Sequence, residues 1–246
     1  MLAVSDETSD ELLATPDLVR TAQLILACGD LPFDYLDALL NALEVPLVFV
    51  PGNHDPDVSG YRSSRAGLTL RAGLPATAPY PDGAVNADRR ILDVAGLRVA
   101  GLGGCPRYSE GPNQYPERQQ ARRALLLRGA ARLRELRDGR GVDVLITHAP
   151  PRGIGDGDDL AHRGFTALHG LTGALRPTAL LHGHVHPYGM RTVPGKLHGT
   201  VVYNVTGWHL LEIRPGLGVS ALLPVRARPG GHVRPGRRAF GHHDAG

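Results

Sequence analysis

Short runs of apolar residues recur along the chain, and each run ends abruptly in a polar or glycine-containing turn. The five clearest runs cover residues 2–5, 24–28, 46–50, 143–147 and 179–182. Continuous apolar runs of this length are typical of strands that are buried on both faces. The pattern therefore predicts a set of central strands inside the molecule.

Segments with helical spacing lie between these runs, at residues 34–43, 117–136 and 165–175. The longest of the three carries four leucines on an otherwise arginine-rich surface: Leu125, Leu126, Leu133 and Leu136. Strands that alternate with helices in this way predict a layered α/β domain, with the strands buried between helices.

Two further pairs of short apolar segments are separated by turn residues. Residues 91–94 and 97–102 flank Ala95-Gly96, and residues 201–204 and 209–213 flank Thr206-Gly207. Because two strands joined by a short turn commonly pair with each other, we expect two antiparallel hairpins here.

Composition places the chain among globular proteins of one sizeable domain. It has 246 residues, of which 42% are hydrophobic and 21% are charged. No apolar run approaches the ~18 residues of a membrane-spanning helix, and the N-terminus lacks the features of a secretory signal. Two cysteines, Cys28 and Cys105, are too few for a disulfide framework. We expect one domain over residues 1–223, a basic flexible tail over residues 224–246, and a cytoplasmic location.

The charge balance is basic, with a net charge of +3 and an isoelectric point near 9.1. A basic surface can bind polyanions. However, Lys196 is the single lysine, and abundant arginine beside abundant glycine indicates a bias in composition. A nuclease or RNA-binding protein is therefore a minor alternative, which predicts salt-sensitive binding that is lost with the tail.

Residues capable of binding metal follow the five predicted central strands, directly or within a few residues. They are Asp6 after the first strand, Asp30 after the second, Asn53 and His54 after the third, His148 after the fourth, and His184 and His186 after the fifth. In open α/β sheets, ligands bind at the carboxyl ends of the strands. We therefore expect these side chains to converge at one edge.

Carboxylate, amide and imidazole ligands suit divalent ions such as Mn, Fe, Zn or Ni. A carboxylate such as Asp30 can bridge two ions, and two ions ~3.5–4 Å apart can clamp a phosphate and generate hydroxide from water. A further imidazole can protonate the departing oxygen. Each motif is weak alone, and the order of the whole set carries the prediction.

This order of motifs, Gly-Asp, Gly-Asn-His-Asp, Thr-His-Ala-Pro and Gly-His-Val-His, resembles the calcineurin-like metallophosphoesterase superfamily. The resemblance implies two facing mixed β-sheets flanked by helices in four layers, with two metal ions at one edge. It also implies hydrolysis of a phosphate mono- or diester by metal-activated hydroxide. By position, Asp30 would bridge the ions and His54 would be the catalytic imidazole. The second metal site would add Asn53, His148 and His184, and the first would add Asp6 and His186.

One position departs from the family pattern, because Thr8 stands where the family has a histidine ligand. Three interpretations follow: the first site binds its ion weakly or through water, Glu7 or Asp10 reaches in, or the second site alone is metallated. A non-catalytic metal-binding scaffold of the same fold is the rival function, and the presence of His54 argues against it.

Candidate substrate residues come from two polar loops. Residues 103–115 contain Arg107, a partner for phosphate, and Asn113, while His162 follows the acidic stretch 155–159. Loops on a scaffold commonly carry specificity, although an ordinary surface loop explains these segments equally well. We expect a small phosphorylated substrate such as a nucleotide and no membrane partner. The sequence gives no oligomeric state.

Overall fold

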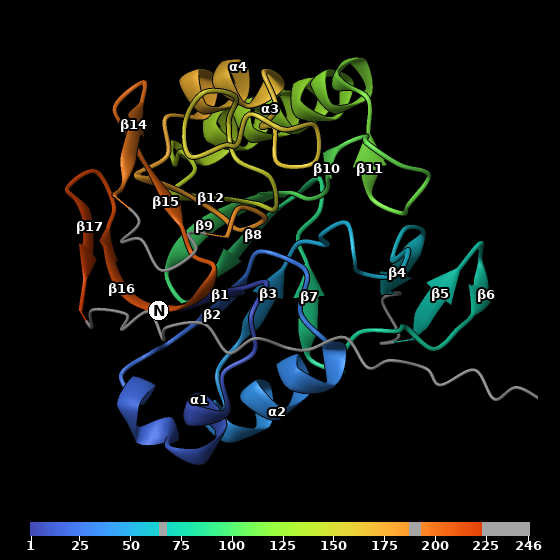
Figure 1. Ribbon diagram of the computed structural model, residues 1–246, viewed down its shortest axis with the longest axis vertical. Helices are drawn as coiled ribbons and strands as arrows, with labels where there is room; N and C mark the ends of the chain where they lie inside the picture. The colour runs from blue at the N-terminus through green and yellow to red at the C-terminus, as the bar shows by residue number, and fades with distance from the viewer. Residues whose placement is uncertain (64–67, 187–192, 223–246) are drawn as a thin grey trace, which may run out of the picture.

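The chain forms two facing β-sheets with helices on both outer sides. The structure is a computed structural model and describes residues 1–63, 68–186 and 193–222. Figure 1 shows the four layers in order: helices α3 and α4, one sheet, the second sheet, and helices α1 and α2. This arrangement confirms the predicted fold class. The predicted tail, residues 224–246, lies outside the described residues.

The sheet that contains the N-terminus has six strands. In spatial order these are β17 (Gly218–Ala221), β16 (Gly207–Arg214), β1 (Leu2–Ser5), β2 (Ile25–Ala27), β3 (Leu47–Phe49) and β7 (Ala84–Asn86). Its neighbouring strands β1, β2, β3 and β7 run parallel to one another, whereas β16 is antiparallel to both β1 and β17.

The facing sheet also has six strands. In spatial order these are β14 (Gly195–Leu197), β15 (Thr200–Asn204), β13 (Ala179–His182), β12 (Val144–Thr147), β9 (Leu97–Leu102) and β8 (Arg90–Val94). Its four inner strands are parallel, and the two outer strands are antiparallel to their neighbours. All five predicted central strands therefore exist, in two sheets.

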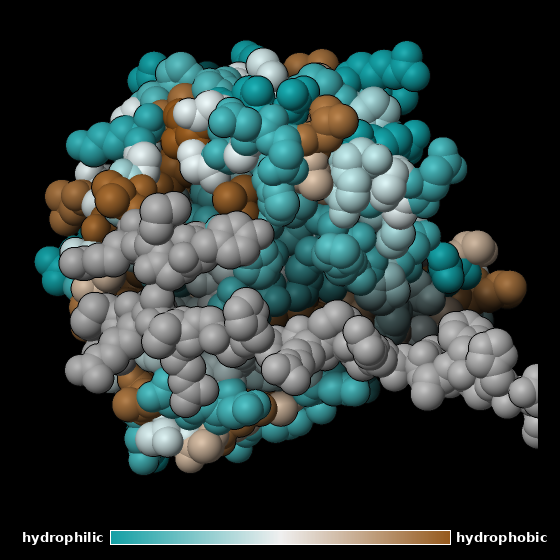
Figure 2. Space-filling model, viewed as in Figure 1, coloured by the Kyte–Doolittle hydropathy of each residue, from teal (hydrophilic) through white to brown (hydrophobic). Residues whose placement is uncertain are grey.

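Alternate residues of the central strands enter different hydrophobic cores. In β1, Ala3 faces the core between the two sheets, whereas Val4 packs toward α1 and α2. In β12, Ile146 faces the inter-sheet core, whereas Leu145 packs toward α3 and α4. Successive side chains of a strand point to opposite faces, so both faces of these strands must be apolar. Figure 2 shows that the face seen in Figure 1 is mostly hydrophilic where it is not grey.

In the described parts of the chain, four α-helices and one 3₁₀ helix cover the sheets. They are α1 (Asp10–Ala14), the 3₁₀ helix Pro16–Val19, α2 (Phe33–Leu43), α3 (Glu117–Asp138) and α4 (Ala167–Leu175). The helices predicted at residues 34–43, 117–136 and 165–175 are confirmed, with bounds shifted by one or two residues. The two short helices near the N-terminus were not predicted, since five residues carry too little periodicity.

Helix α3 packs against its sheet through small and polar residues. Ala124, Leu127 and Ala131 are buried, together with Gln120 and Arg123. The four leucines that marked this segment in the sequence, Leu125, Leu126, Leu133 and Leu136, are all exposed. Arg123 is buried because it forms an ion pair with Asp88 at 2.7 Å and stacks on the ring of Tyr115.

One of the two predicted hairpins is wrong. Strands β8 and β9 do pair around Ala95-Gly96, but β15 and β16 belong to different sheets. β15 lies parallel to β13, and β16 lies antiparallel to β1. The chain crosses between the sheets at Val205, which is buried in the inter-sheet core. The two strands exist as predicted, but each finds a longer-range partner.

Short strands outside the two main sheets were also not predicted. β4 (Tyr61–Ser63), β5 (Thr69–Arg71) and β6 (Leu74–Pro75) form a small antiparallel sheet, and β10 (Cys105–Pro106) pairs with β11 (Gln114–Tyr115). Among the described residues, no helix has the length and apolar character needed to cross a membrane.

Candidate metal centre

The parallel strands of both sheets deliver polar side chains to one edge of the molecule. Asp6, Asp30 and Asn53 follow β1, β2 and β3 of one sheet, while His148 and His184 follow β12 and β13 of the other. Three of these residues have left-handed backbones, with φ of 61° at Asp6, 57° at Asp30 and 68° at His184. Such conformations cost energy in residues other than glycine, so the surrounding contacts must hold these turns in place.

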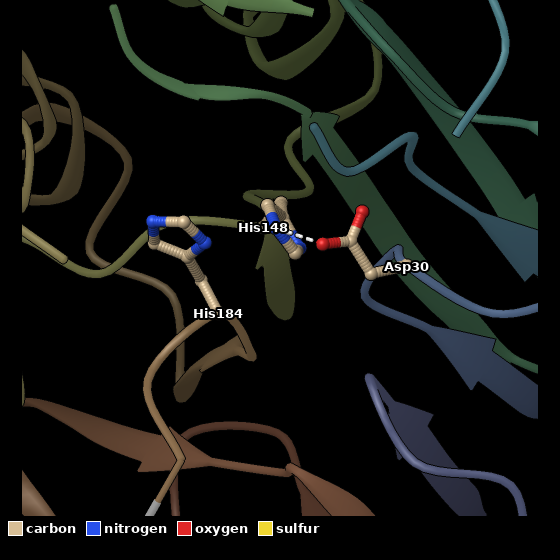
Figure 3. Close-up of side chains that lie close together, drawn as sticks. All are labelled: Asp30, His148 and His184. Carbon is tan, nitrogen blue, oxygen red and sulfur yellow. Dashed lines mark ion pairs between the residues drawn. The ribbon is translucent and has the colours of Figure 1, made fainter. Parts of the chain in front are cut away.

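Asp30, His148 and His184 form the closest group of potential ligands. Their ligand atoms all lie within 4.8 Å of one another. Figure 3 shows His148 between the other two side chains. Its Nε2 atom lies 3.2 Å from Oδ2 of Asp30. The ring centroids of His148 and His184 are 4.8 Å apart. Two sheets thus contribute to one cluster, as the sequence predicted.

The hydrogen bonds of His148 prepare it to bind a cation. Its Nδ1 atom lies 2.7 Å from the carbonyl oxygen of Cys28, and this bond requires the proton to be on Nδ1. Nε2 therefore faces the cluster, where oxygens of Asp30 and Asn53 lie 3.2 and 3.0 Å away. Metal-binding histidines usually donate their other N–H to an oxygen in this way.

The charges in the cluster favour a positive group at its centre. Burial disfavours an imidazolium, but the Asp30 carboxylate outweighs that effect and raises the pKa of His148 to about 9. Although burial alone would raise the pKa of Asp30, His148 holds it below its usual value. Burial, followed by repulsion from His148, lowers the pKa of His184 to about 3 and keeps that ring neutral. A carboxylate, an amide oxygen and two imidazoles therefore fit a divalent cation.

Asn53 completes this group and is itself held by a tyrosine. Its Nδ2 atom donates to the hydroxyl of Tyr108 at 3.0 Å, so its Oδ1 atom faces His148. The two ends of an amide differ in hydrogen-bonding role, and the phenol fixes which end faces the cluster. We call Asp30, Asn53, His148 and His184 the second site.

Asp55 holds the backbone of two ligand-bearing turns, at Asp30 and just before Asn53. Its buried carboxylate accepts N–H groups from Asp30 at 3.0 Å and Gly52 at 2.7 Å. Burial raises the pKa of Asp55. The sequence interpretation gave Asp55 no function, although it is the last residue of the Gly-Asn-His-Asp motif, and that was the available signal.

Gly29 lies where its backbone closely approaches Gly52 and His148. A Cβ atom at Gly29, which has φ of 95°, would lie 2.5 Å from the Gly52 nitrogen and 2.8 Å from Nδ1 of His148. Any larger side chain would therefore separate Asp30 from its neighbours.

The remaining predicted ligands lie at the same edge but do not join the cluster. Both carboxylate oxygens of Asp6 accept the backbone N–H of His184, at 2.9 and 3.1 Å. The Nδ1 atom of His186 lies 3.0 Å from Oε1 of Glu7, and Thr8 is exposed. Within the described part of the chain, just one cluster of His, Cys, Asp or Glu has metal-binding geometry, and it contains neither Asp6 nor His186. We call Asp6, Asp30 and His186 the first site.

His54 is exposed beside the second site. Its backbone N–H donates to Oδ1 of Asp30 at 2.8 Å, and its charge contributes to the lowered pKa of that carboxyl. The imidazole is therefore close to the ligands and accessible to a substrate.

The three predicted substrate residues lie on two sides of the centre. The ring of His162 is 5.6 Å from that of His184, and its Nδ1 atom lies 2.8 Å from Asp159. Arg107 and Asn113 line a pocket of about 740 Å³. The amide of Asn113 donates to the carbonyls of Gly52 and Asp55, so it also braces the loop that carries Asn53. Substrate binding by all three stays a prediction.

Comparisons with known proteins agree with this geometry. A family model described as calcineurin-like phosphoesterase matches residues 4–188, which include all six predicted metal ligands. One crystal structure aligns with a TM-score of 0.56 and 16% identity, over 85% of this chain and 92% of its own. Another, of TT1561 of Thermus thermophilus, aligns with a TM-score of 0.52 and 18% identity, over 84% and 88%. At these identities the two structures show a shared fold. A search of curated proteins found no match.

Proposed function

Because the chain belongs to the calcineurin-like phosphoesterase family, whose members hydrolyse phosphoesters with divalent metal ions, we propose that it hydrolyses a small phosphate monoester or diester. The observation that supports this most strongly is the second site. Four donors from four different strands meet there, and the hydrogen bond from Nδ1 of His148 to Cys28 turns its Nε2 atom toward the other donors. A metal-binding scaffold would need the four donors, but it would have no use for the exposed imidazole of His54 beside them.

The residues of the centre divide the chemistry among them. Divalent ions, when bound, supply Lewis acidity to the phosphoryl group and to water. The described contacts leave His54 free to approach the ester oxygen from solvent. In the proposed reaction the His54 imidazolium donates its proton to the leaving oxygen, which would otherwise depart as an alkoxide.

The pocket beside the centre supports a small anionic substrate. Its wall carries the exposed Arg89, Arg107 and Arg122, together with the half-buried ring of Tyr115. Three carboxylates also line it, those of Asp57, Glu110 and Asp88, and the last is paired with Arg123. Guanidinium groups bind phosphate oxygens through paired hydrogen bonds. In the proposal this pocket holds the part of the substrate that does not react, for which a nucleotide is a suitable size.

The test is turnover of bis(4-nitrophenyl) phosphate and 4-nitrophenyl phosphate by protein freed of metal and then given Mn²⁺. We expect Mn²⁺ to restore activity, and the preferred compound identifies the enzyme as a diesterase or a monoesterase. The double variant Asn53→Ala, His54→Ala should lose roughly 10³-fold in kcat/KM, since it removes a ligand and the proton donor. Asn41→Ala, on the exposed face of α2, is the matched control.

Unchanged turnover in the double variant would contradict the proposal. Tight Mn²⁺ binding without turnover of either compound would instead favour the scaffold alternative.

A further inference from the structure

Thr8 occupies the position of a missing ligand and does not replace it. Its side chain is exposed and makes no hydrogen bond within the described residues. A neutral hydroxyl on a short side chain is also a poor donor for the divalent ions that imidazole binds. The first site would therefore keep three donors, unless another residue reaches it.

Glu7, the residue before Thr8, reaches toward this position. Its Oε1 atom lies 3.0 Å from Nδ1 of His186, although 179 residues separate the two in sequence. The preceding residue, Asp6, is fixed by the backbone N–H of His184. Two segments far apart in the chain thus bring Asp6, Glu7 and His186 to the same side of the edge.

Asp10, the other acidic residue near Thr8, lies elsewhere. It begins α1, and its charge contributes to the raised pKa of Tyr35 on α2, for which burial is the main cause. Its carboxylate therefore faces the outer helices rather than His186. Of the two acidic residues available, the contacts select Glu7.

An ordinary surface ion pair is the simpler interpretation of Glu7 and His186, but it explains little. Their side chains are 58% and 37% exposed, and exposed pairs contribute ~0–1 kcal/mol to stability. The pair therefore adds little to the stability of the fold. The same exposure allows Glu7 to turn toward a cation at little cost.

We propose that Glu7 supplies the metal ligand that Thr8 does not, so that the first site consists of Asp6, Glu7, Asp30 and His186. Replacing a neutral nitrogen donor with a second terminal carboxylate makes this site harder and more negative. Oxygen-rich sites favour Mg²⁺ and Mn²⁺ over ions that prefer nitrogen or sulfur. The inference takes the position of the site from the proposed function, but its test does not depend on turnover.

The experiment measures metal stoichiometry in the full-length protein. Wild type, Glu7→Gln and Asp10→Asn are freed of metal, titrated with Mn²⁺ by calorimetry, and analysed for bound Mn²⁺ after dialysis. Glutamine can still accept a hydrogen bond from Nδ1 of His186, so this variant separates a ligand from a residue that merely orients the ring. Thermal unfolding without metal checks that the fold is intact.

Wild type and Asp10→Asn should bind two Mn²⁺ per chain. Glu7→Gln should bind one tightly, with the affinity for the other reduced by more than the roughly 10–100-fold that loss of an orienting partner causes. Adding Thr8→His to Glu7→Gln should restore two ions and shift the preference of the first site from Mn²⁺ toward Zn²⁺.

Two Mn²⁺ in Glu7→Gln, both with affinities within tenfold of wild type, would overturn the inference. So would a single Mn²⁺ in wild type. Neither result contradicts the proposed hydrolysis, since the second site and His54 are unchanged. Conversely, two ions without turnover would leave Glu7 as a ligand and contradict the proposed function.

Discussion

The two halves of the metal centre differ in how firmly the protein holds them. In the second site, His148 and His184 are buried, and each of three donors has a further contact: Cys28 holds His148, Tyr108 holds Asn53, and the backbone of His54 holds Asp30. In the first site, Glu7 and His186 are partly exposed and contact each other.

This difference teaches where a substitution is tolerated. Changing His148 leaves the buried carbonyl of Cys28 without its hydrogen bond, which costs ~1–3 kcal/mol. Changing Thr8 or its neighbours affects groups that water can solvate. The departure from the family pattern accordingly falls in the exposed half.

The largest expected effect comes from Asp30, the residue that both halves share. Asp30→Asn keeps an oxygen that can accept the N–H of His54 but removes the bridging charge. We expect at least ~10³-fold loss of kcat/KM, the equivalent of losing several kcal/mol of Lewis-acid stabilisation. Steady-state kinetics with Mn²⁺ checks this, and Asp34→Asn at the start of α2 is the control. A loss below tenfold would mean that Asp30 holds no ion during turnover.

The next effect concerns stability on the strand that borders the first site. His209 lies on β16 opposite Ala3 of β1, and its ring packs against Tyr203. Burial lowers the pKa of His209 to about 4, whereas in the unfolded chain it titrates near ~6.5. Below ~6.5 the unfolded state binds the extra proton, so the free energy of unfolding should fall by about 3 kcal/mol between pH 6.5 and 4 and then level off.

Urea unfolding at pH 7.5, 5.5 and 4 measures this dependence. The variant His209→Phe should lack the contribution of His209 to the pH dependence of the free energy of unfolding. Equal pH dependence in wild type and variant would show that His209 is not buried in its neutral form.

The smallest effect tests how the second site is held. Tyr108→Phe removes the hydroxyl that orients the amide of Asn53. A hydrogen bond contributes ~0.5–1.5 kcal/mol, so the affinity of the second site for Mn²⁺ should fall about fivefold. Calorimetric titration measures this affinity. Tyr61→Phe, whose hydroxyl contacts Arg71 away from the centre, should change nothing. If Tyr61→Phe lowered the affinity for Mn²⁺ more than Tyr108→Phe does, the role assigned to Tyr108 would be wrong.

Much of the second site followed from the sequence, because local patterns specify it. Apolar runs predicted the strands, and a polar residue at the end of each parallel strand must lie at one edge. The position of Asp30, Asn53, His148 and His184 required no knowledge of side-chain contacts. The place of His54 beside them followed in the same way, whereas its catalytic role came from the family resemblance and stays a prediction.

What the sequence could not predict depends on contacts between distant segments. The hydroxyl of Tyr108 contacts Asn53, 55 residues away, and no local pattern signals that bond. Strands β15 and β16 look like a hairpin locally, yet β15 pairs with β13 and β16 pairs with β1, in different sheets. The exposed leucines of α3 show the same limit, since helical spacing does not reveal that Arg123 and Gln120 are buried instead.

The most direct test of the central claim is a crystal structure of the protein soaked with Mn²⁺ and phosphate, with anomalous scattering used to locate the ions. We predict one ion bound by Asp30, Asn53, Nε2 of His148 and His184, and another bound by Asp30, Asp6, Glu7 and His186. Ions bound elsewhere, with these side chains pointing away from them, would contradict the account.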